Sequence, residues 1–502
     1  MGIDFHRSIA QKYGRTVAGS GFFTDSYNLF ASNVILPALG YVYWADDENH
    51  NKASAFNLAT LGASAVGQLV FGIFADIGGR RSLYGIELII VIVSTVGLLQ
   101  SSGGYSDGEH STWDVTVWLI FWRAIMGLGI GAGIAAEWSS TKSRGRLMSA
   151  VFFMQPLGQL CAYGAGLTAL RIFGTSPVEI DKLWRYVIGI GAFPTLLALG
   201  FRIYMPESGR YTFDVRRSIP KDDSYMANGR VSGTTGERDA VHDASWENFH
   251  LGELWTYIWR EGHWIYLFGT CACWFLLDFA FYGMGFNNPS TLAKLWTNQD
   301  IQFSSNSPWW LNSSSIVNAT IDGVAVVNGT VTAATMVDGV NYTAGSVAGP
   351  LIHPVLEANI LHAIYTVSIA SILGSILMIA TINRFDRKDM LTVTFFAIGI
   401  LLIIVASSFA ALFHHESLYV LLIVFWAVIS FLFSFGPNTL TFIIPAEVFP
   451  TKYRCSFYGI AAASGKSGAL FVQIIISKVS QTGKPNSLRL RWLLQVRSTQ
   501  GP

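Results

Sequence analysis

Runs of predominantly apolar residues, each about 20 residues long, recur eleven times along this chain. An α-helix rises about 1.5 Å per residue, so a run of this length crosses the roughly 30 Å hydrocarbon core of a bilayer. Charged residues make up only 13% of the 502 residues, against about 25% in soluble domains, and they gather between the runs. The sequence therefore predicts an all-α polytopic membrane protein and argues against a soluble multidomain enzyme. The predicted spans are 18–42, 54–76, 83–102, 115–137, 147–170, 184–205, 264–287, 356–381, 390–412, 418–443 and 456–477.

The charges in the short connections orient these spans. Lys and Arg are enriched in the connections around residues 80–81, 142–146, 384–388 and 452–454. The alternate connections, such as 103–114, are mostly acidic or neutral. Because Lys and Arg are enriched on the cytosolic side of membrane proteins, we expect these basic connections in the cytosol. The amino terminus and the central linker then lie on the same side.

The order of spans divides the chain into four segments. Residues 1–205 contain six spans, residues 206–262 form a polar cytosolic linker, residues 263–479 contain five spans, and residues 480–502 form a basic tail. The connection 289–354 falls on the outer side by the charge rule. It contains four acceptor triplets for N-glycosylation, which supports an outer, glycosylated loop. These triplets begin at Asn312, Asn318, Asn328 and Asn341.

The overall charge and the motifs that are missing exclude several other functions. The chain carries 33 Lys and Arg against 32 Asp and Glu, a balance that argues against nucleic-acid binding. It contains no Gly-rich nucleotide loop, metal-ligand cluster or nucleophile constellation. We therefore expect no enzymatic activity, cofactor or metal. The expected surroundings are a lipid bilayer, and the sequence does not indicate an oligomeric state.

One cytosolic connection has the composition of a gating loop. Between spans two and three the sequence runs Gly72-Ile-Phe-Ala-Asp76-Ile-Gly-Gly79-Arg80-Arg81. Gly72 allows close approach of two helices, Gly79 allows a tight turn, and the arginines suit the cytosolic interface. Asp76 is placed to pair with the end of a neighbouring helix, in a contact that breaks when access changes. A generic basic connection is the alternative interpretation of this loop.

Charged residues within the spans indicate where function lies, because an unpaired charge in hydrocarbon is costly. Asp25 lies in span one, Glu87 in span three, Arg123 in span four, Asp278 in span seven and Lys466 in span eleven. Each of them could instead be a structural ion pair or a charge that reaches the interface. We expect functional roles above all for the deeper Asp25, Asp278 and Lys466.

Span seven carries an unusual polar stripe. Trp274, Asp278 and Tyr282 are four residues apart, so they lie on one face of the helix. Asn438 in span ten, Lys466 in span eleven and Gln155 in span five add further polar groups. Together they predict a donor-rich centre with one cation, which suits a small oxyanion. The carboxylate would oppose the anion until it is protonated, a physical route to proton coupling.

The motifs resemble two nested families. The loop at 72–81 and the segment Pro206-Glu-Ser-Gly-Arg-Tyr211 resemble those of the major facilitator superfamily. The strings around Asp25, Glu87, Asp278, Asn438 and Lys466, with the segment 445–454, are similar to the phosphate:proton symporter family of fungi and plants. The resemblance covers about residues 15–475, apart from the linker and the outer loop.

The resemblance implies a major facilitator superfamily fold with two pseudo-symmetric halves, in a plasma membrane of fungal type. It also implies a phosphate site formed by six residues and a proton path formed by three. The phosphate site would comprise Gln155, Trp274, Asp278, Tyr282, Asn438 and Lys466. The proton path would comprise Asp25, Glu87 and Arg123.

The chain departs from the family pattern at several places, among them Asn28, which replaces a second acid in span one. In the family, span four continues beyond the Gly-rich run at 127–131 into an acid and a Tyr that contact phosphate and protons. Here about six residues are missing, enough to turn the rest of that helix by more than a full revolution, and Glu137 resembles a later acid. The repeat of the gating loop carries Asn383 in place of an acid, and the tail 480–502 replaces a twelfth span.

The sequence leaves three possible functions open. The first is proton-coupled uptake of inorganic phosphate. The second is transport of another small organic anion, such as a glycerophosphodiester, which would need a roomier site. The third is a transport-inactive phosphate receptor, because span four and the last span are incomplete.

Overall fold

The computed structural model describes most of the helical part of the chain. The described residues are 2–44, 51–77, 85–101, 114–131, 144–174, 176–203, 252, 255–285, 326–327, 330–331, 348–414 and 419–481. The predicted glycosylation sites Asn312, Asn318, Asn328 and Asn341, the altered part of span four at 132–143 and the tail 482–502 lie outside them.

Within the described residues, the first six predicted spans correspond to eight helices. They are α1 (Gly2–Tyr43), α2 (Asn51–Ile77), α4 (Ile86–Leu99), α5 (Val115–Ile130), α6 (Arg144–Phe152), α7 (Met154–Ile172), α8 (Pro177–Ile190) and α9 (Ala192–Ile203). Span five is divided at Phe153, shortly before Pro156, which has no backbone N–H to donate. Span six is divided at Gly191.

The five later spans correspond to a second group of helices. After the π-helical turn η4 (Thr256–Arg260) come α13 (Trp264–Gly285), the two-residue strands β1 (Val326–Val327) and β2 (Thr330–Val331), and α15 (Ala348–Ala363). The chain continues through η6 (Ile364–Ser368), α16 (Ile369–Thr381), α17 (Arg387–His414), α18 (Tyr419–Phe435), α19 (Pro437–Val448), η7 (Thr451–Tyr453) and α20 (Arg454–Gln481). Span ten is divided at Gly436, because Pro437 starts a new helix.

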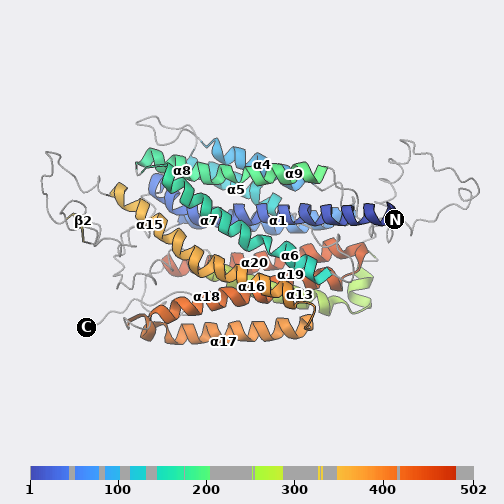
Figure 1. Ribbon diagram of the computed structural model, residues 1–502. Coiled ribbons are helices and arrows are strands. Elements are labelled where there is room, and N and C mark those ends of the chain that lie inside the picture. The colour runs from blue at the N-terminus through green and yellow to red at the C-terminus, as the bar shows by residue number, and fades with distance from the viewer. Residues whose placement is uncertain are drawn as a thin grey trace, which may run out of the picture.

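The two groups lie side by side along the length of the molecule (Figure 1). The first group, coloured blue to green, forms the upper part of the view, and the second group, coloured yellow-green to red, forms the lower part. Helices α2 and α20 pack together across the boundary between the groups, and α7 and α15 form a second contact across it. The end of the predicted linker is helical, and its Tyr257 ring packs 5.8 Å from that of Phe457 on α20.

The outer faces of the bundle suit a lipid environment. Within the described residues, seven helices are long and apolar enough to cross a bilayer, and α4 and α5 are shorter apolar helices. Large apolar side chains are exposed around the bundle, such as Phe193 at 72% and Phe396 at 69%. Such a continuous apolar surface is unfavourable in water but matches hydrocarbon.

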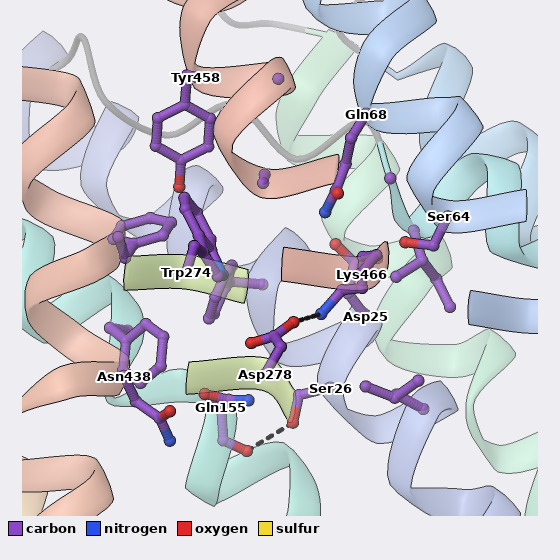
Figure 2. A pocket seen from close by; sticks show the side chains of 18 of the residues that line it. Asp25, Ser26, Ser64, Gln68, Gln155, Trp274, Asp278, Asn438, Tyr458 and Lys466 are labelled. Carbon is purple, nitrogen blue, oxygen red and sulfur yellow. Dashed lines mark hydrogen bonds and ion pairs between the residues drawn. The ribbon is translucent and has the colours of Figure 1, made fainter. Parts of the chain in front are cut away.

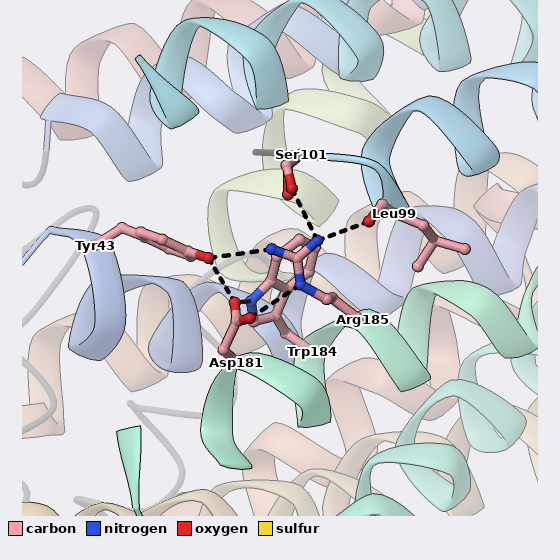
Figure 3. Close-up of polar contacts among 6 residues, drawn as sticks. All are labelled: Tyr43, Leu99, Ser101, Asp181, Trp184 and Arg185. Carbon is pink, nitrogen blue, oxygen red and sulfur yellow. Dashed lines mark hydrogen bonds and ion pairs between the residues drawn. The ribbon is translucent and has the colours of Figure 1, made fainter. Parts of the chain in front are cut away.

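A polar cluster explains why hydropathy places the start of span six too late. Asp181 accepts hydrogen bonds from Tyr43 Oη at 2.5 Å, from Trp184 Nε1 at 2.8 Å and from Arg185 Nε at 3.1 Å (Figure 3). Arg185 also donates to the carbonyl oxygen of Leu99 at 2.6 Å. These charges satisfy one another and tie the ends of α1, α4 and α8. The helix therefore begins at Pro177, after the cap Ser176, rather than at 184.

The first group is held together by direct backbone contact between α2 and α5. A Cβ atom added to Gly127 would lie 2.4 Å from the carbonyl oxygen of Thr60, and one added to Gly131 would lie 2.5 Å from that of Ser64. Only glycine permits this separation, because the obstacles are backbone atoms that have no freedom to rotate away. This contact sets the position of the α2 face that looks toward the centre of the bundle.

We predict that Gly127→Ala lowers the free energy of unfolding by about 1–3 kcal/mol, since the added methyl group must push α2 and α5 apart. The matched control is Gly164→Ala on α7, where an added Cβ atom has no neighbour within 4 Å. Thermal unfolding of the purified variants in detergent measures the difference. Equal melting temperatures for the two variants would contradict the predicted contact.

Candidate functional site

A cavity of about 130 Å³ lies at the centre of the bundle, between the two groups of helices (Figure 2). Its polar lining comes from both groups. Asp25 and Ser26 lie on α1, Ser64 and Gln68 on α2, Gln155 on α7, Trp274, Asp278 and Tyr282 on α13, Asn438 on α19, and Tyr458 and Lys466 on α20. The six residues predicted for a phosphate site are thus brought together, and Asp25 from the predicted proton path lies with them.

An ion pair occupies the middle of this lining. Lys466 Nζ donates hydrogen bonds to Asp278 Oδ2 and to Tyr282 Oη, each at 2.9 Å. The side chains are almost enclosed, with 15% of Lys466 and 7% of Asp278 exposed. The ammonium also lies 4.5 Å from the centre of the Tyr282 ring. The one cation among the named lining residues is therefore compensated by a carboxylate from a different helix.

Close packing of α13 on α20 makes this short ion pair possible. A Cβ atom added to Gly465 would lie 2.3 Å from Trp274 Cδ1, and one added to Gly468 would lie 2.3 Å from the carbonyl oxygen of Phe275. The two glycines flank Lys466 and bring its helix against the Trp274–Tyr282 stripe. The stripe spacing of four residues then presents all three side chains to the cavity.

The remaining polar walls are also fixed by local structure. Ser26 Oγ donates to the carbonyl oxygen of Gln155 at 2.6 Å, which ties α1 to α7 beside the cavity. Asn438 lines the cavity from the first turn of α19, directly after the break at Gly436 and Pro437. The break places an amide side chain, rather than a continuous apolar face, at the cavity wall.

Two residues of the predicted proton path do not line the cavity. Arg123 on α5 is 1% exposed and donates to Ser32 Oγ and to the carbonyl oxygen of Asn28 at 3.3 Å. It also lies 4.5 Å from the centre of the Phe56 ring. Glu87, 6% exposed, lies in the first turn of α4. A role of Glu87 and Arg123 in proton transfer stays a prediction.

Asp76, at the end of α2, binds the start of α20. Its carboxylate accepts hydrogen bonds from the amides of Cys455 at 3.3 Å and Ser456 at 2.7 Å, and from Ser456 Oγ at 2.9 Å. A carboxylate at a helix amino terminus satisfies otherwise unpaired N–H groups and the positive end of the helix dipole. We call this contact the Asp76 latch. Gly79, Arg80 and Arg81 of the same loop lie outside the described residues.

Gly72 lies one turn before the latch and lets the two helices meet. A Cβ atom there would lie 2.7 Å from the carbonyl oxygen of Cys455 and 3.2 Å from Gly459 Cα. The contact between α2 and α20 is thus made by backbone on both sides. This packing holds the Asp76 carboxylate close to the backbone amides of Cys455 and Ser456, which donate hydrogen bonds to it.

The corresponding position in the second group carries no carboxylate. Asn383 and Arg387 lie beside the first turn of α6, with Asn383 Oδ1 3.4 Å and an Arg387 Nη atom 2.9 Å from where a Cβ of Gly145 would be. Arg387 forms its ion pair at 2.6 Å with Glu447 on α19, within its own group. The substitution to Asn383 therefore leaves the second contact without the charge that strengthens the Asp76 latch.

Sequence reasoning missed four polar lining residues. Ser26, Ser64, Gln68 and Tyr458 all contribute to the cavity, but neutral residues do not stand out in an apolar span as charges do. The spacing of Ser64, Gln68, Gly72 and Asp76 at intervals of four residues was a usable signal, because it marks one face of α2.

Comparison with known proteins identifies the family. The profile of the family described as "Sugar (and other) transporter" matches residues 15–287 and 353–488. The chain belongs to this transporter family. It is therefore an integral membrane protein of a family of carriers and not an enzyme.

Two curated relatives and one solved structure refine this placement. The chain is 33% identical to the "Repressible high-affinity phosphate permease" of Neurospora crassa, over 93% of this chain and 77% of the relative. It is 29% identical to the "Inorganic phosphate transporter PHO84" of Saccharomyces cerevisiae, over 96% and 78%. The structure of the proton:xylose symporter XylE shares the fold, with a TM-score of 0.64 at 17% identity, over 97% of this chain and 94% of that one. The fold of this transporter is that of the major facilitator superfamily, as the sequence predicted.

We predict that Asp76→Ala opens the start of α20 in this transporter. Loss of a helix-capping side chain costs about 1 kcal/mol, which raises the population of a locally opened state about five-fold. Cys455, which is 1% exposed, should then react about five times faster with a thiol reagent. The measurement uses protein in which Cys161, Cys271 and Cys273 are replaced by serine.

Asp389→Ala is the control, because Asp389 is an exposed acid in the first turn of α17. It should leave the reaction rate of Cys455 unchanged. An Asp76→Ala variant that reacts no faster than this control would show that the latch does not hold α20.

Proposed function

We propose that this transporter is a proton-coupled symporter that imports inorganic phosphate by alternating access. The observation that carries the proposal is the ion pair of Lys466 with Asp278 in a small polar cavity between the two groups of helices. A lysine supplies the cation that an oxyanion needs, and a carboxylate beside it supplies a site for the proton. The named phosphate carriers among the relatives support the choice of anion.

The ion pair makes proton binding a condition for anion binding. Two like charges about 4 Å apart repel by about 4 kcal/mol at an effective dielectric constant near 20. An anion placed beside ionised Asp278 therefore loses about a thousand-fold in affinity. Protonation of Asp278 removes this repulsion and releases Lys466 from its partner. Lys466, Tyr282, Trp274, Asn438 and Gln155 then hold the phosphate oxygens.

Protonation of Asp25 accompanies the same step. Asp25 lines the same cavity from α1. A second carboxylate so close to an anion opposes binding while it is ionised, for the same reason as Asp278. We expect protons to pass between Asp25 and the cytosol by way of Glu87 and Arg123.

The size of the cavity favours a small anion. Its volume is about 130 Å³. Pockets for larger organic ligands measure about 300–1,000 Å³. Inorganic phosphate therefore fits better than a glycerophosphodiester, which would need the walls to move apart.

Contacts that bridge the two groups at either end support alternating access. The Asp76 latch joins α2 to α20, and on α15 His353 Nε2 lies 2.7 Å from the carbonyl oxygen of Leu170 on α7. Neither contact survives a rocking motion that opens its end of the bundle. We place the protein in the plasma membrane, with its amino terminus, its linker and the Asp76 latch on the cytosolic side.

The first test is uptake of labelled phosphate, at acid and neutral outside pH, in cells that lack their own phosphate carriers. Uptake should rise at low pH and collapse with an uncoupler. Absence of uptake by protein displayed normally at the cell surface would favour the third function, a phosphate receptor that does not transport.

We predict that Asp278→Asn abolishes uptake that depends on the proton gradient, since the amide neither binds a transported proton nor pairs with Lys466. Asp389→Asn, a substitution of the same chemistry on an exposed part of α17, should transport normally. The amount of each variant at the surface is measured alongside. Normal pH-dependent uptake by Asp278→Asn would disprove the coupling role.

A further inference from the structure

One face of α2 and one face of α20 form a continuous seam from the cavity to the Asp76 latch. On α2 the seam comprises Ser64, Gln68, Gly72 and Asp76, each one turn from the next. On α20 it comprises Cys455, Gly459, Ala462 and Lys466. All of these residues except Asp76 also line the cavity. The candidate anion site and the latch are therefore two ends of one contact between the groups.

The backbones of the seam touch near its middle. A Cβ atom added to Gly459 would lie 2.4 Å from the carbonyl oxygen of Gln68 and 3.3 Å from Gly72 Cα. Gln68 thus sits at the point where α2 crosses α20, and its side chain extends from there into the cavity (Figure 2). Lys466 lies two turns along α20 and faces the same space.

Two acceptor atoms on the α2 side of this space lack a hydrogen-bond partner among the described residues. Ser64 is 2% exposed, and neither its Oγ nor Gln68 Oε1 makes a hydrogen bond there. By contrast, Thr60, one turn earlier on α2, donates to its own helix at the carbonyl oxygen of Phe56. A buried polar atom without a partner is unfavourable, so both atoms are expected to gain one in another state of the protein.

We infer that Ser64 and Gln68 contact the transported anion and select a protonated oxyanion, and that the anion thereby closes the seam. This inference rests on the function proposed above. Singly protonated or doubly protonated phosphate presents both oxygen acceptors and O–H donors. The Gln68 amide offers N–H donors and the acceptor Oε1, and the Ser64 hydroxyl offers both as well. Sulfate carries no proton near neutral pH and leaves both acceptors unsatisfied.

The positions of Ser64, Gln68 and Lys466 link anion binding to closure of the seam. Lys466 belongs to the second group of helices, whereas Ser64 and Gln68 belong to the first. An anion that bonds to both sides gains its full set of contacts only while α2 and α20 stay together. By reciprocal coupling, the bound anion then favours the closed seam and the intact Asp76 latch at its end.

The test measures binding of phosphate and of sulfate to the purified full-length protein by titration calorimetry. Gln68→Leu keeps a side chain of similar size without polar atoms, and Ser64→Ala removes the hydroxyl. A hydrogen bond to a charged group contributes enough that its loss weakens binding about ten-fold or more. We expect this rise in the phosphate Kd for Gln68→Leu, a smaller rise for Ser64→Ala, and loss of the preference for phosphate over sulfate.

Ser467→Ala is the matched control. Ser467 is next to Lys466, but it is exposed, lies outside the cavity lining and donates to the carbonyl oxygen of Ala463 on its own helix. It should bind phosphate like the wild type. If Gln68→Leu is poorly folded by circular dichroism, Gln68→Glu replaces it, since it keeps the volume and should weaken phosphate binding further through its negative charge.

A second measurement reports directly on closure of the seam between α2 and α20. With Cys161, Cys271 and Cys273 replaced by serine, phosphate should protect Cys455 in the seam from a thiol reagent. In Gln68→Leu the same protection should need about ten-fold more phosphate.

The outcomes separate the two proposals. A wild type that binds phosphate, with Gln68→Leu showing the same Kd, the same anion preference and the same protection of Cys455, overturns the inference and leaves the proposed function standing. A wild type that does not bind phosphate overturns the proposed function, and the inference falls with it.

Discussion

The buried ion pair between Lys466 and Asp278 is the interaction on which the rest of this transporter depends. A lysine in the middle of a membrane protein is tolerated only with a compensating charge, and removal of either partner of a buried pair costs about 3–5 kcal/mol. The glycines on either side of Lys466 bring α20 close enough to α13 for the pair to form. Under the proposed function, the pair also makes anion binding depend on protonation, because Lys466 becomes available to an anion when Asp278 is neutralised.

The helix that carries Lys466 is also held by the Asp76 latch. The start of α20 is capped by Asp76 from α2, and its middle lines the cavity, so the candidate site and the latch share one helix. The seam between α2 and α20 is built from backbone contacts at Gly72 and Gly459. Because these contacts are so close, α2 and α20 cannot slide along each other without moving apart. Under the proposed function, a change at the cavity is transmitted as opening or closing of this packed interface. The corresponding contact at Asn383 lacks a carboxylate, which makes the two contacts unequal in strength.

The sequence predicted much of the fold because membrane helices are encoded locally. About 20 apolar residues in a row specify a span wherever they occur, since the backbone must satisfy its own hydrogen bonds in lipid. The errors fall where polar residues are satisfied within the bundle. The charges Asp181 and Arg185 made the start of α8 look like a loop, although they pair with each other and with Tyr43 inside the fold. The division of span ten at Gly436 has another cause, because Pro437 starts a new helix there.

The sequence by itself determined the class of protein, the spans, and the stripe of Trp274, Asp278 and Tyr282, because these depend on composition and on a helical period of 3.6 residues. The tertiary structure alone decided which partners meet. Lys466 and Asp278 are 188 residues apart, and Ser456 and Asp76 are 380 apart, so no local pattern relates them. It also brought the neutral Ser64 and Gln68 into the cavity. Their position depends on how glycines let α2 approach α5 and α20, and that approach is a property of packing between helices rather than of any one helix.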